Sequence, residues 1–371
     1  MTVEGELTVR LDWDGRRVQG VTIRSSRPFA VAQALAGRAP EEAAAMVPRL
    51  YSLCAEAQGA AAASAAAAAT GVDPGSRPPE ARESAVVYET VQEHLWRLLV
   101  DWPQIAGREP HYAPVALARK AVAALRVGTG AATAEAAATL AAVAQEAVYG
   151  ESAAGWLATG DAAALEAWLA RAGTVPAALL AELLQTYPHL GRSTVALMPA
   201  ATESALRRSI LPALENDAGF ERTPLWDGTP AETGALARTR DHPLVAALRA
   251  RDGNTAATRM VARLVELAQL VAGLPRSTPW VQGFAPVPGD GVGAVQTARG
   301  LLVHRVRVAA GRVHDYRIVA PTEWNFGPAG PLAAGLADAE AGTAAELERQ
   351  ARLAVQALDP CVACRVEIGH A

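Results

Sequence analysis

The spacing of apolar and polar positions changes three times along the chain. From Glu6 to Arg24, apolar residues alternate with polar ones on both sides of Asp14-Gly15, a pair that favours the tight turn of a β-hairpin. From Pro40 to about Pro286 the apolar spacing is mostly three and four, with Gly and Pro as punctuation, which predicts a body of helices. Alternation returns over 301–319, and helical spacing returns over 343–358. These segments predict a second hairpin and a last helix.

This order of elements indicates an α+β fold with a mainly helical body, an N-terminal β-hairpin and a second β-hairpin in the C-terminal half. Half of the 371 residues are apolar, enough for one large core. We expect a single domain over 1–371. Its parts are an N-terminal hairpin region over 1–38, a helical body over 39–285, and the second hairpin, last helix and terminal Cys-x-x-Cys over 286–371.

Composition and charge exclude several classes of protein. The net charge is -4 and the charged residues of both signs are interspersed, so the basic stripe that binds nucleic acid is missing. The long apolar run from Gly59 is mostly alanine, which is too weakly hydrophobic for a membrane span and predicts a tightly packed helix instead. The first residues show no signal-peptide pattern. We therefore expect a cytoplasmic protein with no membrane insertion.

The candidate chemistry lies in three cysteines: Cys54, Cys361 and Cys364. Two thiolates three residues apart can face one soft or borderline metal ion. A structural zinc site needs four ligands at paired spacings, whereas a redox Cys-x-x-Cys normally follows a strand and opens a helix. Cys54 has no Cys or His within several residues, and the terminal pair follows a helix. These two readings are therefore disfavoured, and inert core cysteines remain an alternative.

Several short motifs, in order along the chain, resemble the large subunit of nickel-iron hydrogenases. They are VEGEL at 3–7, RPFAVAQALAGRAP at 27–40, RLYSLCAEAQ at 49–58, TARGLLVHRVRV at 297–308, PTEWN at 321–325 and DPCVAC at 359–364. Each motif is weak by itself, but the ordered set indicates the superfamily. The resemblance is strongest to the truncated HupK/HoxV-type hydrogenase maturation proteins.

The resemblance implies an incomplete metal site. At the family's four cysteine positions, Cys54 and Cys364 match the two that bridge nickel and iron, Cys361 matches a nickel-only position, and Tyr51 occupies the other. A phenol with a reference pKa near 10 is a poor replacement for a thiolate on nickel. Two family histidines are replaced by Gln58 and Glu367. The ligand set thus favours iron, and nickel is not expected.

The resemblance further implies a scaffold that transiently binds Fe(CN)2(CO) and catalyses no turnover of hydrogen. Cys54 and Cys364 would hold the iron, with Cys361 as a third metal-site thiol. Arg299 would hydrogen-bond the cyanides, and Glu4 would hydrogen-bond Cys361. The implied partners are hydrogenase maturation complex proteins and the precursor hydrogenase large subunit. Two alternatives remain open: a degenerate hydrogenase with residual activity, and a metal-free chaperone of the large subunit.

Three other polar residues are expected to have structural roles only. His94 and His304 lie on apolar-periodic segments, so we expect them to be satisfied core side chains rather than ligands. Asn325 follows Trp324, and we expect its amide to bond backbone at a structural corner.

Overall fold

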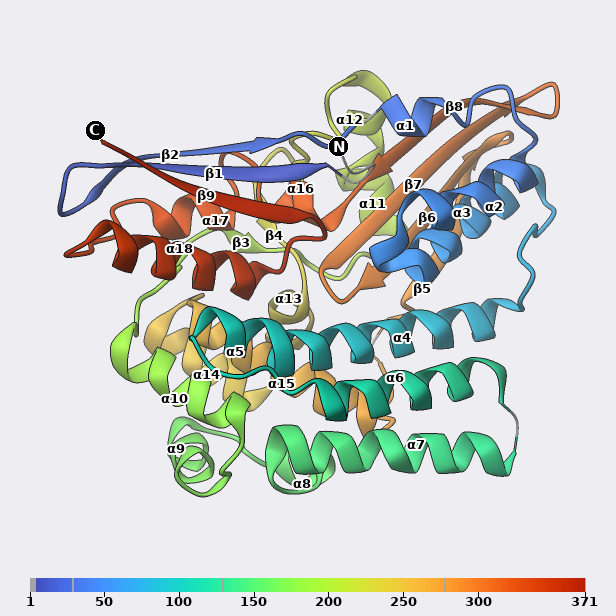
Figure 1. The fold of residues 1–371 in the computed structure, drawn as a ribbon. Helices are drawn as coiled ribbons and strands as arrows, with labels where there is room; N and C mark the ends of the chain where they lie inside the picture. The colour runs from blue at the N-terminus through green and yellow to red at the C-terminus, as the bar shows by residue number, and fades with distance from the viewer. Residues whose placement is uncertain (1–4, 29, 129, 277, 371) are drawn as a thin grey trace.

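The computed structural model describes residues 5–28, 30–128, 130–276 and 278–370, which form a mixed assembly of helices and strands (Figure 1). A three-stranded sheet lies above two C-terminal helices at the upper left of the view. A four-stranded sheet and its covering helices occupy the upper right, and the lower half is helical. This arrangement confirms the expected α+β fold with a mainly helical body.

The three-stranded sheet joins the two ends of the chain. Strands β1 (Glu6–Trp13) and β2 (Val18–Ser25) form the predicted hairpin, with Val9 opposite Ile23. Strand β9 (Ala363–His370) adds to β1 in parallel, which places Cys364 opposite Leu7. Alternate β1 residues are fully buried, because one face of the sheet packs onto helices α17 (Pro331–Leu336) and α18 (Ala344–Leu358).

The four-stranded sheet is a meander of β5 (Val281–Val287), β6 (Asp290–Thr297), β7 (Gly300–Ala309) and β8 (Arg312–Val319). Helices α2 (Pro40–Leu50) and α3 (Ala55–Thr70) cover it. Helix α3 is the predicted alanine helix, and it lies so close to β6 that a Cβ at Gly293 would stand 2.0 Å from the Ala61 carbonyl oxygen. Small residues on both elements permit this approach.

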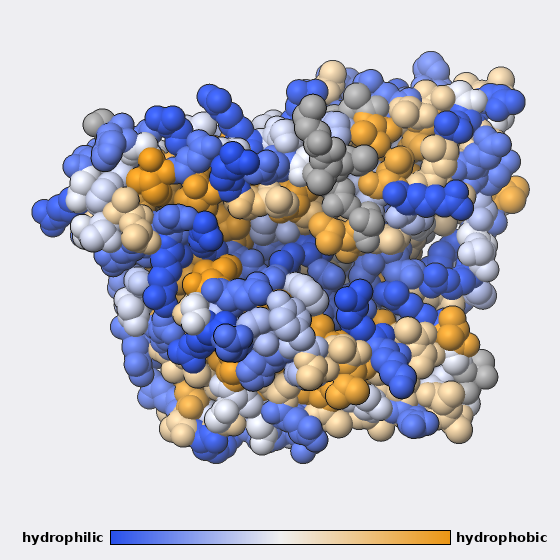
Figure 2. Space-filling model, viewed as in Figure 1, coloured by the Kyte–Doolittle hydropathy of each residue, from blue (hydrophilic) through white to orange (hydrophobic). Residues whose placement is uncertain are grey.

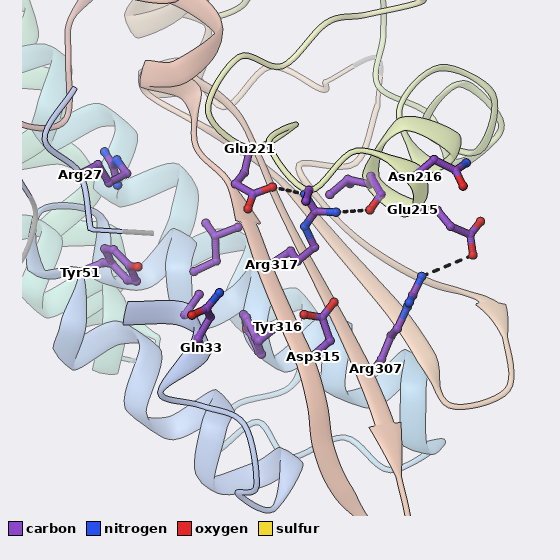
Figure 3. Close-up of a pocket in the computed structure, with 14 residues that line it drawn as sticks. Arg27, Gln33, Tyr51, Glu215, Asn216, Glu221, Arg307, Asp315, Tyr316 and Arg317 are labelled. Atoms are coloured by element: carbon purple, nitrogen blue, oxygen red, sulfur yellow. Dashed lines mark hydrogen bonds and ion pairs between the residues drawn. The ribbon is translucent and has the colours of Figure 1, made fainter. Parts of the chain in front are cut away.

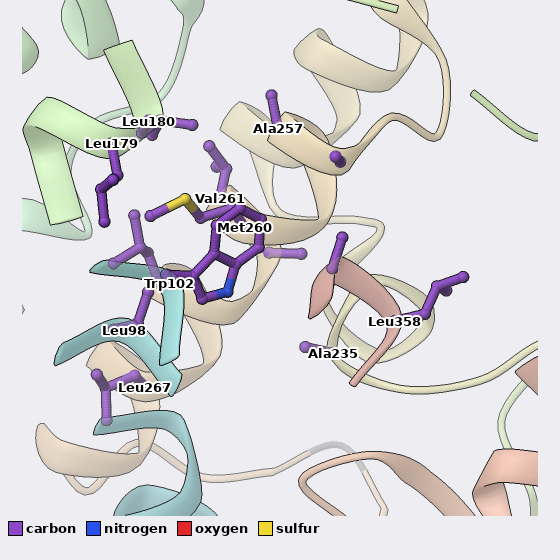
Figure 4. Packing of buried hydrophobic residues seen from close by; sticks show 14 of the residues in the cluster. Leu98, Trp102, Leu179, Leu180, Ala235, Ala257, Met260, Val261, Leu267 and Leu358 are labelled. Atoms are coloured by element: carbon purple, nitrogen blue, oxygen red, sulfur yellow. The ribbon is translucent and has the colours of Figure 1, made fainter. Parts of the chain in front are cut away.

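The helical body surrounds α15 (Ala256–Val271), in which every residue from Ala256 to Ala268 is buried. A helix that is enclosed on all sides in this way forms the centre of a large core. Figure 4 shows Met260 and Val261 of α15 packed among side chains of α10 (Val175–Thr186) and α18, together with Leu98 and Trp102. Leu98 lies in a π turn (Arg97–Asp101) that follows α4 (Pro79–Trp96), and Trp102 begins α5 (Trp102–Ile105).

The remaining elements complete the body and the connections between the sheets. They are α1 (Ala30–Gln33), the 3-10 turn η1 (Ser52–Cys54), α6 (Tyr112–Val127), α7 (Ala131–Ala144), the π turn η3 (Gln145–Tyr149), α8 (Ala153–Trp156), α9 (Ala162–Arg171), β3 (Ala196–Leu197), α11 (Glu203–Ser209), α12 (Leu211–Asn216), β4 (Ala231–Glu232), α13 (Ala235–Thr239), α14 (Pro243–Asp252) and α16 (Pro321–Asn325). None of the helices in the described ranges combines the length and apolar character needed to cross a membrane.

Two details differ from the sequence-based expectations. The helical body was expected to extend to residue 285, but β5 begins at Val281, and β5 and β6 extend the second hairpin into a four-stranded sheet. Strand β6 is buried on nearly every residue, so it lacks the alternation that marks a half-buried strand. Strand β9 was not expected either, although Cys364, Val366 and Ile368 alternate with polar neighbours.

Candidate thiol site

Cys54 and Cys361 come from opposite ends of the chain, yet they lie close enough for the charge of Cys361 to act on the Cys54 thiol. Cys54 ends the η1 turn and immediately precedes α3, whereas Cys361 follows α18. Burial raises the pKa of the Cys54 thiol, and negative charge at Cys361 and then at Glu89 raises it further. Arg299 and an amide hydrogen bond act in the opposite direction. In the metal-free protein Cys54 is therefore a neutral thiol near neutral pH.

The Cys361 sulfur receives two strong hydrogen-bond donors. Nη2 of Arg27 lies 2.7 Å from Sγ, and the Thr322 hydroxyl lies 2.8 Å from it. The Thr322 oxygen also accepts the Cys361 backbone N–H at 3.1 Å, so the hydroxyl hydrogen is free to point at sulfur. Arg27 is held in turn by Glu323, with Nε 3.0 Å from a carboxylate oxygen. These fixed donors would stabilise negative charge on Cys361.

Cys54 lies at the end of a buried chain of hydrogen bonds. The Gln58 amide nitrogen lies 3.7 Å from the Cys54 sulfur, and its amide oxygen lies 2.9 Å from Nε2 of His304. Nδ1 of His304 lies 2.9 Å from the Tyr316 hydroxyl. Burial lowers the pKa of His304 to about 3, so a neutral ring donates to Gln58 and accepts from Tyr316. His304 is thus a satisfied core side chain, as expected.

Arg299 is buried beside the two thiols. Its Nη2 lies 2.6 Å from Glu93 and its Nε lies 3.2 Å from Asp359. Burial opposes its charge, but Asp359, Glu93 and the two thiol groups together raise its pKa well above the ordinary value. Arg299, which the TARGLLVHRVRV motif singled out, therefore lies close enough to Cys54 and Cys361 for their charges to act on it.

Asp359 joins α18 to the thiol site in an unusual backbone conformation. The residue is buried and left-handed at φ 56°, a region that Asp and Asn tolerate better than most residues. Besides Arg299, its carboxylate pairs with Arg97 at 2.7 Å and with Arg263 at 3.9 Å. These cations hold the pKa of Asp359 at about 2 against the effect of burial. The Asp-Pro that precedes Cys361 is therefore an electrostatic anchor for the terminal segment.

Cys364 lies in different surroundings. It is half-buried in β9, and burial raises its pKa to about 12. Its charged neighbours are Glu6, which adds to that rise, and Arg352, which opposes it. Cys361 has the largest effect among the charges that act on Cys54, and the expected pairing of Cys54 with Cys364 as iron ligands stays a prediction. Glu4, expected to bond Cys361, lies outside the described residues.

Two hollows flank the thiol site. The first, of about 310 Å³, lies between β8 and the α12 segment, and Figure 3 shows Arg27 and Tyr51 at one end and the Arg317–Glu221 and Arg307–Glu215 pairs at the other. The second, of about 600 Å³, contains Cys364. Figure 2 shows the surface hollowed between the upper sheet and the lower helices, with mostly hydrophilic residues around the hollow.

The thiol site has few metal-ligating side chains around it. Within the described part of the chain, no group of three or more His, Cys, Asp and Glu side chains converges to hold a bare ion. Tyr51, at the family's fourth cysteine position, is buried.

Several simpler expectations about neighbouring residues are also resolved. His94 is fully buried and bonds Glu266 at 2.8 Å, so it is a core side chain. The Asn325 amide accepts the Thr233 N–H and donates to the Thr233 carbonyl, which confirms its backbone role. Sequence reasoning missed Arg27, because its only signal was a place in the RPFAVAQALAGRAP motif, 334 positions from Cys361.

Comparison with known proteins supplies the family. Residues 246–367 match the family model described as nickel-dependent hydrogenase. The hydrogenase expression/formation protein HoxV of Cupriavidus necator is 33% identical over 100% of this chain and 98% of its own. The HupK protein of Azotobacter vinelandii, also named for hydrogenase expression/formation, is 32% identical over 99% of each chain.

Solved structures show the same fold. The Ni-Fe-Se hydrogenase from D. vulgaris Hildenborough, in the reduced state, superposes with a TM-score of 0.57 at 17% identity, covering 93% of each chain. A likeness at that identity establishes the large-subunit fold alone. Taken with the end-to-end matches to HoxV and HupK, it shows that the chain belongs to the HoxV/HupK family of hydrogenase expression/formation proteins, within the nickel-iron hydrogenase large-subunit superfamily.

Proposed function

We propose that this protein is a scaffold in the maturation of a nickel-iron hydrogenase. It transiently binds an Fe(CN)2(CO) unit, receives it from hydrogenase maturation complex proteins and passes it to the precursor large subunit. The names of the relatives support a role in hydrogenase formation rather than hydrogen turnover. The iron unit is the cargo of this protein and not a resident cofactor.

The observation that carries the proposal is the convergence of Cys54 and Cys361 beside two buried arginines. Iron(II) with two cyanides and one carbonyl is neutral, so two thiolate ligands make the bound unit dianionic. Arg299 lies in range of both sulfurs and Arg27 donates to Cys361. Their guanidinium groups offset that charge, and guanidinium N–H groups can donate hydrogen bonds to cyanide nitrogen.

Protonation explains how the site can hold and then release its cargo. Burial keeps Cys54 a thiol in the empty protein, so iron binding must displace its proton and release must return one. Two neighbouring thiolates without metal repel each other and are unfavourable in a buried site. Protons therefore favour release of the iron unit, which suits a site of transient binding. Tyr51 supplies no thiolate where the family's nickel-only cysteine would stand, which supports iron without nickel.

The test is the infrared spectrum of protein purified anaerobically from cells that assemble a nickel-iron hydrogenase, together with its iron and nickel content. We expect carbonyl and cyanide bands, about one iron per chain and no stoichiometric nickel. Cys54→Ala and Cys361→Ala should each lose the bands and fail to support hydrogenase maturation. Ser84→Ala, an exposed change on α4, should behave as wild type.

Other results would favour the alternatives. Full maturation with both cysteine variants, and no bands in the wild-type protein, would indicate a metal-free chaperone. Stoichiometric nickel with hydrogen-dependent dye reduction would indicate a degenerate hydrogenase. Circular dichroism of each variant establishes that a loss of bands reflects lost ligands rather than lost folding.

A further inference from the structure

Cys364 lines an open pocket. The pocket has a volume of about 600 Å³, within the range of natural small-ligand sites. Cys364 is the one thiol among its described lining residues. The walls come from β1, η1, the π turn, α5, α18 and the terminal segment, and they include Glu6, Leu53, Arg97, Asp101 and Arg352.

The lining of this pocket adjoins the buried thiols along the chain. Leu53, Pro360 and Val362 line the pocket, and they are the direct chain neighbours of Cys54 and Cys361. Cys361 and Cys364 are three residues apart, so their Cα atoms are separated by at most about 10 Å. That bound limits the distance over which iron would pass from Cys364 to Cys361 within the same Cys-x-x-Cys.

The two ends of this route differ in how they would hold an anionic metal unit. At the inner end, Cys361 receives donors from Arg27 and Thr322, and Arg299 lies in range of both inner thiols. At the outer end, the charged neighbours of Cys364 are the carboxylate of Glu6 and the cation of Arg352, and the carboxylate has the larger effect. The inner pair is built to retain the unit, and the outer thiol is not.

We propose that Cys364 is the exchange thiol through which the iron unit enters and leaves, while Cys54 and Cys361 retain it. This role rests on the proposed function and adds an order of events to it. On entry, the bond from iron to Cys364 forms as the bond from iron to the donor's anionic ligand breaks, and the Cys364 proton leaves with that ligand. Iron stays divalent throughout. Cys361 then replaces a second anionic ligand of the donor, and the Cys361 proton leaves with that ligand. Cys54 last replaces the Cys364 thiolate and gives its proton to it, and release reverses the order.

The test measures the direction in which blocking Cys364 changes the rate of iron loss. Wild-type protein that shows the carbonyl and cyanide bands is treated with methyl methanethiosulfonate, and peptide mass analysis confirms that Cys364 is modified. Excess bipyridine is then added to compete for iron, and the decay of the bands measures the rate of iron loss. We expect loss to slow by about tenfold, and to recover when dithiothreitol removes the modification. Cys364→Ser, to the extent that it loads in cells, should show the same slow loss.

Iron loss that is unchanged or faster after Cys364 is blocked would overturn the exchange role. Faster loss would mean that Cys364 retains iron, because removal of a retaining ligand weakens iron binding. Cys361→Ser supplies that comparison and should lose any bound iron faster than wild type. Glu367→Gln, an exposed change on the same strand, controls for disturbance of β9. Absence of bands in the untreated wild-type protein would instead refute the proposed function itself, so the two failures are distinguishable.

Discussion

Replacing Asp359 by Asn tests whether the buried carboxylate anchors the thiol site. The substitution removes one negative charge and leaves Arg97, Arg263 and Arg299 facing one another. Asn keeps nearly the same shape and also tolerates the left-handed backbone found at φ 56°. The expected effect is therefore electrostatic, with little contribution from backbone strain.

Two independent estimates give the size of the effect. The fall in the pKa of Asp359 from 3.8 to about 2 corresponds to roughly 2.5 kcal/mol of native-state stability at neutral pH. Removing one partner of a buried ion pair typically costs about 3–5 kcal/mol. We expect Asp359→Asn to lower the free energy of unfolding by about 3 kcal/mol at pH 7.

The sign of the pH dependence follows from the direction of the shift. A carboxyl whose pKa is lower in the folded protein contributes its stability above the unfolded value and loses it as pH falls through the folded value. The difference between wild type and Asp359→Asn should thus be constant from pH 5 to 8 and should shrink as pH falls from about 4 toward 2.

Urea unfolding monitored by tryptophan fluorescence measures the difference. Asp338→Asn is the matched control, because Asp338 is also left-handed but exposed, with its nearest cation at 3.9 Å. We expect that control to change stability by less than about 0.5 kcal/mol. A loss below 1 kcal/mol for Asp359→Asn, or a difference that does not depend on pH below 4, would refute the anchoring role.

Three further changes test other contacts. Gly293→Ala places a Cβ 2.0 Å from the backbone of α3 and should lower the free energy of unfolding in urea by about 3 kcal/mol. Gly20→Ala is the control, because its Cβ has its nearest contact at 3.4 Å, and it should lower that free energy much less. Burial raises the pKa of Glu89 to about 7. The free energy of unfolding of the wild type should therefore fall by roughly 3 kcal/mol relative to that of Glu89→Gln as pH rises from 5 to 8. The same dependence of unfolding free energy on pH in both proteins would contradict this. Gln58→Ala leaves a buried ring nitrogen of His304 without its partner and should lower the free energy of unfolding by about 1–3 kcal/mol. An unchanged free energy of unfolding would show that the hydrogen-bond chain to Cys54 does not stabilise the protein.

Local chemistry made some parts of the fold predictable from sequence. Asp14-Gly15 between alternating runs located the first hairpin, and the spacing over 343–358 located α18. Strand β6 was missed because both of its faces are covered, which replaces alternation with a continuous buried run that includes Gly291 and Gly293. Contacts with helix α3, rather than local propensity, determine that segment.

The candidate site was predictable only where a motif carried the information. The motifs identified Cys54 and Arg299, and the structure places them near each other. The contacts of Arg27 and Thr322 with Cys361 depend on tertiary packing between distant segments, so no spacing in the sequence could reveal them. The different positions of Cys361 and Cys364 arise because the chain enters β9 between them and commits the second side chain to a strand face.

The parallel pairing of β1 with β9 has a consequence for the timing of biosynthesis. Strand β1 emerges from the ribosome about 350 residues before its partner, which at 5–20 residues per second is a delay of roughly 20 to 70 s. During that interval the N-terminal hairpin has an unsatisfied edge, and Cys54 has no second sulfur. On the proposed function, a nascent chain therefore lacks the second thiol needed to hold the iron unit until Cys361 has been synthesised and the terminal segment has folded.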